Sequence, residues 1–259
     1  MTAVREPTRE LRRLATRIDF ALKQFLSERG TWDLTTKFEA PRHGWTLSNL
    51  ALRHSQSTLT LAKTDMVLAP TAWVTARAAV ETAARCLWLL QPEDEWEREA
   101  RWIALLHEGA RIKRKETEGF PHIVAQAKAI EDFANAVTAE LPDGVSVPKR
   151  VDTIQEILAA EGEGLPRFYV MASQYTHAAE LGTRSYRTNL GTKAVYGDLV
   201  DAKDWLEPLW IAYLSFRVTA MRLIYLKGED LTEILELADR QVAEARDAFV
   251  ASLQAKEPV

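Results

Sequence analysis

The sequence has almost no cysteine and no long uninterrupted apolar run. Cys86 is the only cysteine among 259 residues, so no disulfide can form within the chain. No apolar segment typical of a secretion signal follows the first methionine, and the most apolar window, residues 206–226, is interrupted by Arg217 and Arg222. These absences exclude a disulfide-rich secreted fold. We therefore expect a cytoplasmic protein whose apolar window is a buried helix rather than a membrane span.

A strong charge of either sign is also missing. The chain carries 33 Lys+Arg against 37 Asp+Glu, a formal net charge of −4, which argues against a protein that coats DNA through a broad basic face. Its composition, 47% hydrophobic and 27% charged, is that of an ordinary folded protein. A chain of this length can bury a sufficient core without a metal ion or a disulfide.

The common catalytic signatures are absent from the sequence. It has no G-x-S-x-G elbow, no P-loop and no complete G-x-G-x-x-G, and Gly162-Glu163-Gly164 lacks the third glycine. No Glu-x-x-His pair or zinc-type spacing occurs, and the five histidines are scattered. Cys86 lies in an apolar helical segment, which favours a packed side chain over a nucleophile. We expect no cofactor and no bound metal.

A helical period dominates what is present. Apolar residues recur at spacings of three and four from Leu11 to Leu26, which predicts a first helix over 8–29, with Pro7 and Thr8 as start signals and Gly30 as its stop signal. Similar patterns and breakers predict further helices at 46–69, 71–91, 93–118, 121–140, 152–160, 167–179, 201–227 and 230–254.

Proline and glycine place the expected boundaries. Pro41 and Gly44 predict a loop over residues 31–45, and Pro70 predicts the end of the second helix. Gly228 is expected to end the helix at 201–227, and Asp230 or Thr232 to cap the last helix. No alternating run of β-branched residues is long enough to predict a sheet.

These patterns predict a single all-α domain, a bundle of about eight helices. Helices fill residues 8–141, an irregular middle occupies 142–200, and a helical pair closes the chain over 201–254. More than half of the residues should be helical.

Arg77 and Glu81 form the first candidate site. With about 100° per residue, both lie on the helical stripe of Trp73 and Trp88. Charged groups on an apolar stripe must be paired, and removing one partner of a buried pair alone costs about 3–5 kcal/mol. Three interpretations are open. The two residues form a structural ion pair, or a site in which Arg77 anchors an anion and Glu81 orients it, or they are simply exposed at the surface.

A second candidate lies on the next helix, where Arg101 and His107 form an R-x5-H string. That spacing resembles the short motif of HEPN-type ribonucleases, in which an arginine and a histidine act on the RNA backbone. In an unbroken helix the two side chains would lie about 120° apart. A chance occurrence is the alternative.

A third candidate is the set Tyr169, Ser173 and His177, which lie four residues apart and so share a helix face. One interpretation is a hydroxyl–imidazole network that satisfies buried polar groups. The other is an active site in which His177 acts as acid, base or anion ligand.

The R-A-A-x-E string at Arg77–Glu81 and the later Y-x-x-x-S-x-x-x-H string at Tyr169–His177 resemble a loose group of uncharacterised all-helical actinobacterial proteins. The resemblance covers about residues 70–180. That group is distantly similar to HEPN-like helical bundles, several of which act in phage defence or as toxin ribonucleases. The resemblance implies no established substrate; a HEPN-like member would bind or cleave RNA as a dimer.

Three functions therefore stay open. The first is an RNA-binding or RNA-cleaving homodimer with His177, Arg101 and His107 as catalytic residues, whose ligand contacts come from Arg77, Glu81, Tyr169 and Ser173. The second is a protein that binds a small anionic ligand, or a cofactor-free enzyme, with a Trp- and Tyr-lined pocket between helices. The third is a helical interaction module without catalysis.

Overall fold

A computed structural model describes residues 5–30, 35–116, 120–162, 165–177, 179–188, 195–228 and 231–255. The described part of the chain is 80% helical with almost no strand. The expected all-α multi-helix bundle is therefore confirmed.

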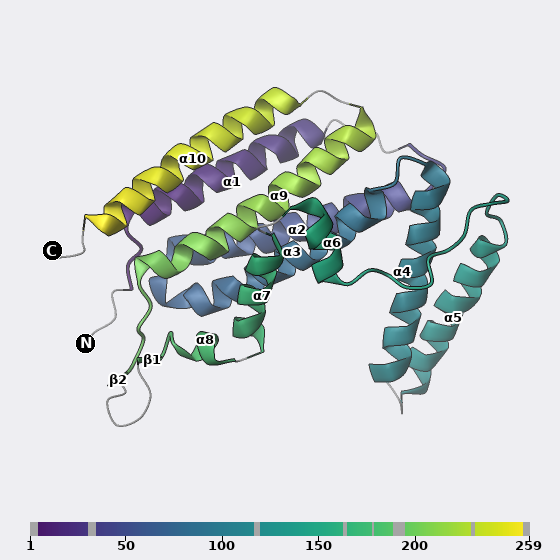
Figure 1. Cartoon of the computed structure of the whole chain (residues 1–259), viewed down its shortest axis with the longest axis horizontal. Helices are drawn as coiled ribbons and strands as arrows, with labels where there is room; N and C mark the ends of the chain where they lie inside the picture. The colour runs from purple at the N-terminus through teal and green to yellow at the C-terminus, as the bar shows by residue number, and fades with distance from the viewer. Residues whose placement is uncertain are drawn as a thin grey trace.

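Five long helices make up the main bundle and run roughly along the long axis of the molecule (Figure 1). They are α1 (Arg9–Arg29), α2 (Glu39–Thr64), α3 (Ala69–Leu90), α9 (Leu206–Lys227) and α10 (Thr232–Gln254). α2, α3 and α9 pack on one another, and α1 packs on α10 and α2. Short 3-10 helices precede α3 and α9, at Met66–Leu68 and Ala202–Trp205.

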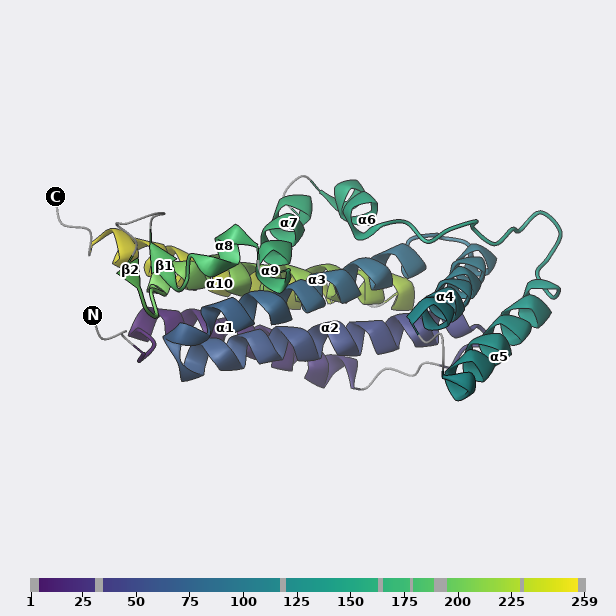
Figure 2. The same ribbon diagram turned by 90° about the horizontal axis from the view of Figure 1, so that it is seen from below.

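Two helices project from one end of this bundle. α4 (Glu95–Glu116) and α5 (Pro121–Thr138) lie side by side and stand across the bundle axis in both ribbon views (Figures 1 and 2). α4 contacts α2 and α3, and α5 packs on α4. We call this helical pair the arm.

Short helices cover one face of α3. α6 (Ile154–Glu161) and α7 (Leu165–Thr176) contact α3 and each other, and α8 (Glu180–Thr183) follows α7. Figure 2 shows them as a separate layer on the bundle. Two two-residue strands, β1 (Arg187–Thr188) and β2 (Val195–Tyr196), pair antiparallel.

The bundle core follows the predicted helical stripes. The apolar face of α1 is fully buried against α9 and α10, where Phe25 meets Phe216 edge to face with ring centroids 5.6 Å apart. A second core under α6 and α7 contains Trp73. The Tyr175 ring stacks on its indole, with the ring centroids 4.9 Å apart.

The predicted start of the second helix is wrong. α2 begins at Glu39, so Pro41 lies in its first turn, where the missing N–H has no intrahelical acceptor to lose. Gly44 lies inside the helix because α3 passes close by. A Cβ atom at this position would lie 2.7 Å from Cδ1 of Leu90. The helix ends at Thr64, and Pro70 stands in the first turn of α3 rather than at the end of α2.

The helix caps are partly as expected. The Thr8 hydroxyl accepts from Leu11 N at the start of α1, and Gly228, with φ of 71°, ends α9 in the left-handed conformation. Thr232 is not a cap: it is the first helical residue of α10, whose N-cap Leu231 makes no side-chain bond. Asp230, the other expected cap, lies outside the described residues.

One helical stretch of the described residues, Ala202–Lys227, is long and apolar enough to cross a membrane by length and composition alone. More than half of its apolar window is buried inside the bundle, and the central helix of a packed core passes the same test.

Candidate functional site

Arg77 and Glu81 form the expected ion pair on α3, with Nη2 of Arg77 2.7 Å from Oε1 of Glu81. The side chain of Arg77 is 14% exposed and that of Glu81 35%, so the pair is buried on its cationic side. Tyr169 of α7 covers Arg77: its hydroxyl accepts from Nη2 at 3.4 Å, and its ring centroid lies 5.4 Å from the guanidinium carbon. The structure therefore brings three of the predicted ligand-binding residues together.

Ser173 and His177 do not join that group. The Ser173 hydroxyl donates to the carbonyl oxygen of Tyr169 at 2.8 Å, a bond within the helix. His177 is exposed, and its backbone N–H donates to the carbonyl of Ser173. In the described part of α7, no side-chain hydrogen bond links the imidazole to either hydroxyl.

Arg101 is held at the base of the arm. Its Nη1 donates to the carbonyl oxygen of Trp88 and, at 3.0 Å, to Oε1 of Gln91, and its guanidinium carbon lies 5.1 Å from the Trp88 ring centroid. Burial lowers the pKa of Arg101. Arg101 lines a cavity of about 360 Å³ together with Trp96 and Glu97.

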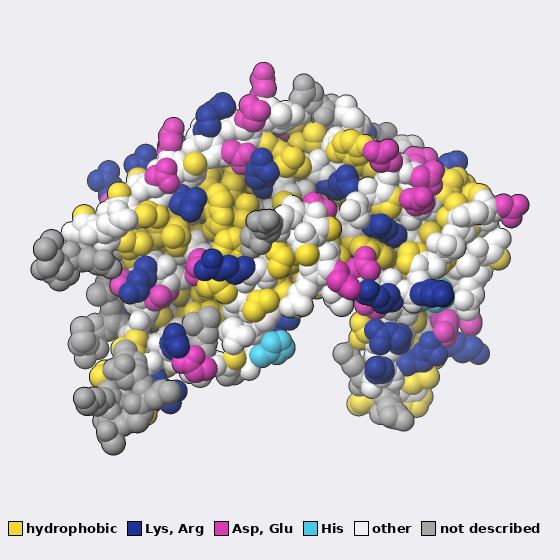
Figure 3. Space-filling model, in the orientation of Figure 1, with side chains coloured by type: hydrophobic (Ala, Val, Ile, Leu, Met, Phe, Trp, Pro, Cys, Tyr) yellow, Lys and Arg dark blue, Asp and Glu magenta, His cyan; other side chains and the backbone are white. Residues whose placement is uncertain are grey.

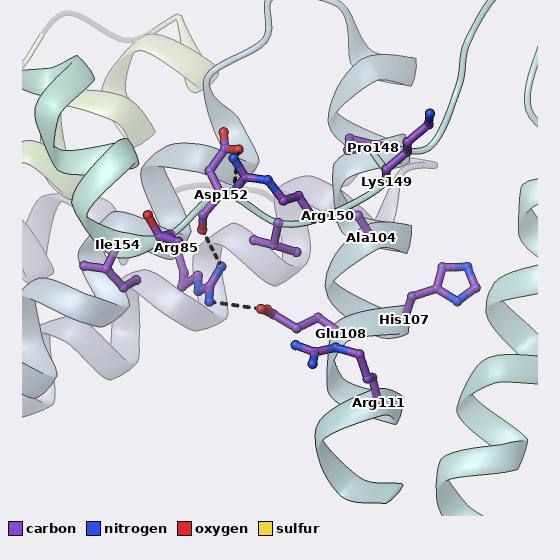
Figure 4. A pocket seen from close by; sticks show the side chains of 12 residues that line it. Arg85, Ala104, His107, Glu108, Arg111, Pro148, Lys149, Arg150, Asp152 and Ile154 are labelled. Atoms are coloured by element: carbon purple, nitrogen blue, oxygen red, sulfur yellow. Dashed lines mark hydrogen bonds and ion pairs between the residues drawn. The ribbon is translucent and has the colours of Figure 1, made fainter. Parts of the chain in front are cut away.

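His107 lies in a different cleft from Arg101. It is among the residues that line a cleft of about 510 Å³ between α3, α4 and residues 148–154. In the close-up of Figure 4, Glu108 extends from α4 toward Arg85, whereas His107 leaves α4 on the other side. The structure of this chain therefore does not bring Arg101 and His107 together.

Arg85 crosses the floor of this cleft (Figure 4). It follows Arg77 and Glu81 on the same stripe of α3, at steps of four residues. Nη1 donates to the carbonyl oxygen of Asp152 at 3.1 Å, and Nη2 lies 3.3 Å from Oε1 of Glu108 on α4. One arginine thus connects α3, the arm and the segment that enters α6.

The segment on the opposite wall is held by a set of short bonds. The indole N–H of Trp88 donates to Oδ2 of Asp152 at 3.0 Å. Thr153 and Glu156 form a capping box at the start of α6, and Arg150 binds both carboxylate oxygens of Glu156 at 2.7 Å. The hydrogen bond from Arg150 lowers the pKa of Glu156 to about 2.

Cationic side chains form the rim. Arg111 on α4 and Lys149 and Arg150 on the opposite segment are all exposed and line the cleft. Among the residues that the structure describes, Arg111 and Lys149 form no ion pair. The basic surface continues along α4 to Lys115, and Figure 3 shows dark blue side chains gathered on the arm and at its junction with the bundle.

The chain was compared with protein-family models, curated proteins and solved structures. None of the three comparisons finds a match. Within the described residues, no group of three or more His, Cys, Asp or Glu side chains is placed to hold a metal ion.

We call the cleft between α3, α4 and residues 148–154 the basic cleft. Sequence reasoning identified only part of it. It named His107 as a site residue but missed Arg85, Glu108, Lys149 and Arg150. Arg85 carried a signal, since it continues the stripe of Arg77 and Glu81 by one further step of four residues. Lys149 and Arg150 gave none, because their approach to α4 depends on the path of a long irregular segment.

Proposed function

We propose that this protein binds RNA, and that the basic cleft between α3, α4 and residues 148–154 receives its phosphate backbone. The observation that carries the proposal is the pair of exposed cations without an ion pair that line the cleft, Arg111 from α4 and Lys149 from the segment before α6. Cations in a concave site attract a polyanion by release of its counterions.

The charge of the cleft is a local feature. The chain as a whole is acidic, at −4, so its cationic cleft does not follow from an overall excess of lysine and arginine. Glu108 neutralises Arg85, and the carboxylates of Glu156 and Asp152 lie against Arg150, which leaves Arg111 and Lys149 as the cations of the cleft without an ion pair. Arg111 and Lys149 can reach a ligand without losing an ion-pair partner. The resemblance to HEPN-like bundles favours RNA as the polyanion.

The proposed activity is binding rather than cleavage. Arg101 is bonded to Trp88 and Gln91 and lines a different cavity, so it is not positioned to act on a phosphodiester beside His107. General acid–base work needs both groups within hydrogen-bond reach of the reacting atoms.

A pair of matched double variants tests the proposal. Arg111→Ala/Lys149→Ala removes two cations from the rim, and Arg13→Ala/Arg17→Ala removes two exposed cations from α1, away from the cleft. The affinity for a fluorescently labelled 20-nucleotide RNA is measured by anisotropy from 50 to 200 mM salt. We expect the rim variant to lose about tenfold or more in affinity and the α1 variant less than about twofold.

The salt dependence gives a second readout. If each rim cation contacts one phosphate of single-stranded RNA, the slope of log affinity against log salt should become shallower by about 1.4. Equal losses in the two double variants, or no RNA binding by the parent protein at 50 mM salt, would refute RNA binding at this cleft.

A further inference from the structure

Several of the groups in the cleft that could read the edge of a base already have a hydrogen-bond partner. Glu108 accepts from Arg85, and the carboxylate of Asp152 accepts from the Trp88 indole while its backbone carbonyl accepts from Arg85. The Thr153 hydroxyl donates to Glu156 at 2.9 Å. Carboxylates and hydroxyls recognise bases only when their lone pairs or protons are available.

Base-stacking surfaces are also scarce. The described residues that line the cleft include no Trp, Tyr or Phe and no Asn or Gln, and His107 is their only aromatic ring. Sequence-specific recognition of single-stranded RNA depends on aromatic platforms and on amide side chains that pair with base edges. Trp88, whose indole N–H donates to Asp152 of the cleft, is only 4% exposed.

The side chains of the cleft that hold no ion-pair partner are long cations. Arg111 and Lys149 present donors on flexible stems, which match phosphate oxygens. From these observations we infer that the cleft holds RNA by its phosphate groups alone and does not read its bases. This inference rests on the proposed function and assigns its ligand chemistry: a repeating phosphate polyanion of any base sequence.

The experiment compares ligands that share phosphates but differ in bases. Labelled 20-nucleotide poly(A), poly(U) and a mixed-sequence RNA are titrated into the parent protein at one salt concentration. Unlabelled linear inorganic polyphosphate, which has neither base nor sugar, then competes with each RNA. We expect the three dissociation constants to agree within about threefold, and polyphosphate to displace all three RNAs completely.

Variants distinguish the contribution of the His107 ring to RNA affinity from that of the two cations. His107→Ala should leave the ratio of poly(A) to poly(U) affinity unchanged, whereas Arg111→Ala/Lys149→Ala should weaken RNA and polyphosphate by the same factor. A preference above about tenfold between the homopolymers, or RNA that polyphosphate cannot displace, would overturn the inference while leaving RNA binding intact. If the parent binds no RNA, or the rim and α1 variants weaken it equally, the proposed function itself fails.

Discussion

Two arginines on one stripe of α3 show how differently neighbouring residues acquire partners. Arg77 pairs with Glu81 one turn along its own helix, whereas Arg85 pairs with Glu108 on another helix. The first pair follows from helical geometry and was predicted from spacing alone. The second depends on where α4 crosses α3, and no local pattern encodes that crossing.

The Arg77–Glu81 pair should contribute less than a fully buried pair. Glu81 is 35% exposed, so water screens part of its interaction, and the 3–5 kcal/mol expected for a buried pair is too large. We expect Glu81→Ala to lower the free energy of unfolding by about 1–2 kcal/mol, measured by urea denaturation. A loss below about 0.3 kcal/mol would mean that water and Tyr169 satisfy Arg77 without its carboxylate.

Cys86 should be chemically inert in the folded protein. The thiol is fully buried, donates to the carbonyl oxygen of Gly44 at 3.4 Å, and has its pKa raised to about 12 by burial. We expect a disulfide reagent at pH 8 to leave the native thiol unmodified for hours and to modify it fully in denaturant. A cysteine introduced by Arg13→Cys on exposed α1 is the control and should react within minutes. Rapid loss of the Cys86 thiol in the native state would contradict this packing.

At the scale of elements, α4 supplies the cap that the start of α2 lacks. Phe38, the N-cap of α2, makes no side-chain cap bond, and the first N–H groups of the helix donate instead to the carboxylate of Glu99. The bonds to Oε2 are 3.1 Å from Glu39 N and 2.9 Å from Ala40 N. A single buried acid thus fixes the base of the arm to the bundle and places a negative charge at a helix N-terminus.

Two replacements of Glu99 distinguish its role as a hydrogen-bond acceptor from the effect of its charge. Glu99→Ala removes the acceptor, and we expect a loss of about 1–2 kcal/mol. Burial raises the pKa of Glu99 above its ordinary value of 4.5 despite those bonds, so the folded protein holds this proton more tightly than the unfolded chain. The contribution of Glu99 to the free energy of unfolding is therefore greatest below pH 4.5, and it falls as the pH rises through the pKa of Glu99 in the folded protein.

Glu99→Gln should show that dependence directly, because glutamine keeps an acceptor but does not titrate. The difference in melting temperature between parent and Glu99→Gln should shift in favour of the variant as the pH rises from 4 to 7, as measured by calorimetry. A difference that is constant over this range would show that the pKa of Glu99 is the same in the folded and unfolded states.

The elements that could be predicted from sequence are those with local determinants. The stripe of α1 and the stop at Gly228 lie where periodicity and glycine geometry placed them. The start of α2 was missed because Gly44 was interpreted as a breaker, while its actual role is to let Leu90 of α3 approach. A close approach between helices is a tertiary property, and single-helix propensity does not contain it.

The same contrast between local and tertiary determinants explains which parts of the candidate site could be predicted. The stripe on α3 was visible from spacing, and Tyr169 was identified, but its contact with Arg77 depends on how α7 crosses α3. Arg101 and His107 matched a motif by count alone, and the structure places them in different cavities. A motif spacing fixes angles on one helix and does not fix what faces each side chain.

At the scale of the whole molecule, the basic cleft lies where three parts of the fold meet. α3 belongs to the bundle, α4 to the arm, and residues 148–153 to the long connection into α6 (Figures 1 and 4). The rim cations come from the arm and the connection, so their separation depends on how these two parts are held against α3. The Arg85 side chain bonds to both: to Glu108 on the arm and to the carbonyl oxygen of Asp152 on the connection.

This arrangement predicts that Arg85 acts on the cleft through geometry rather than charge. Arg85→Met/Glu108→Met removes one charge of each sign, so the net charge of the cleft is unchanged, but the bonds from α3 to the arm and to Asp152 are lost. We expect RNA affinity to fall by about three- to tenfold, because Arg111 and Lys149 are no longer held at a fixed separation, and stability to fall by about 1–2 kcal/mol. Anisotropy titration and urea denaturation of the same preparations measure the two effects.

The matched control keeps the chain's charge and disturbs an ion pair elsewhere. Arg217→Met/Asp239→Met removes a comparable pair between α9 and α10, 2.8 Å apart and similarly exposed, and should alter stability but not RNA affinity. If both double variants bind RNA as the parent does, charge alone governs the cleft and Arg85 has no positioning role. If both bind more weakly to the same extent, the loss reflects general destabilisation, and the coupling between the arm and the connection does not set the affinity.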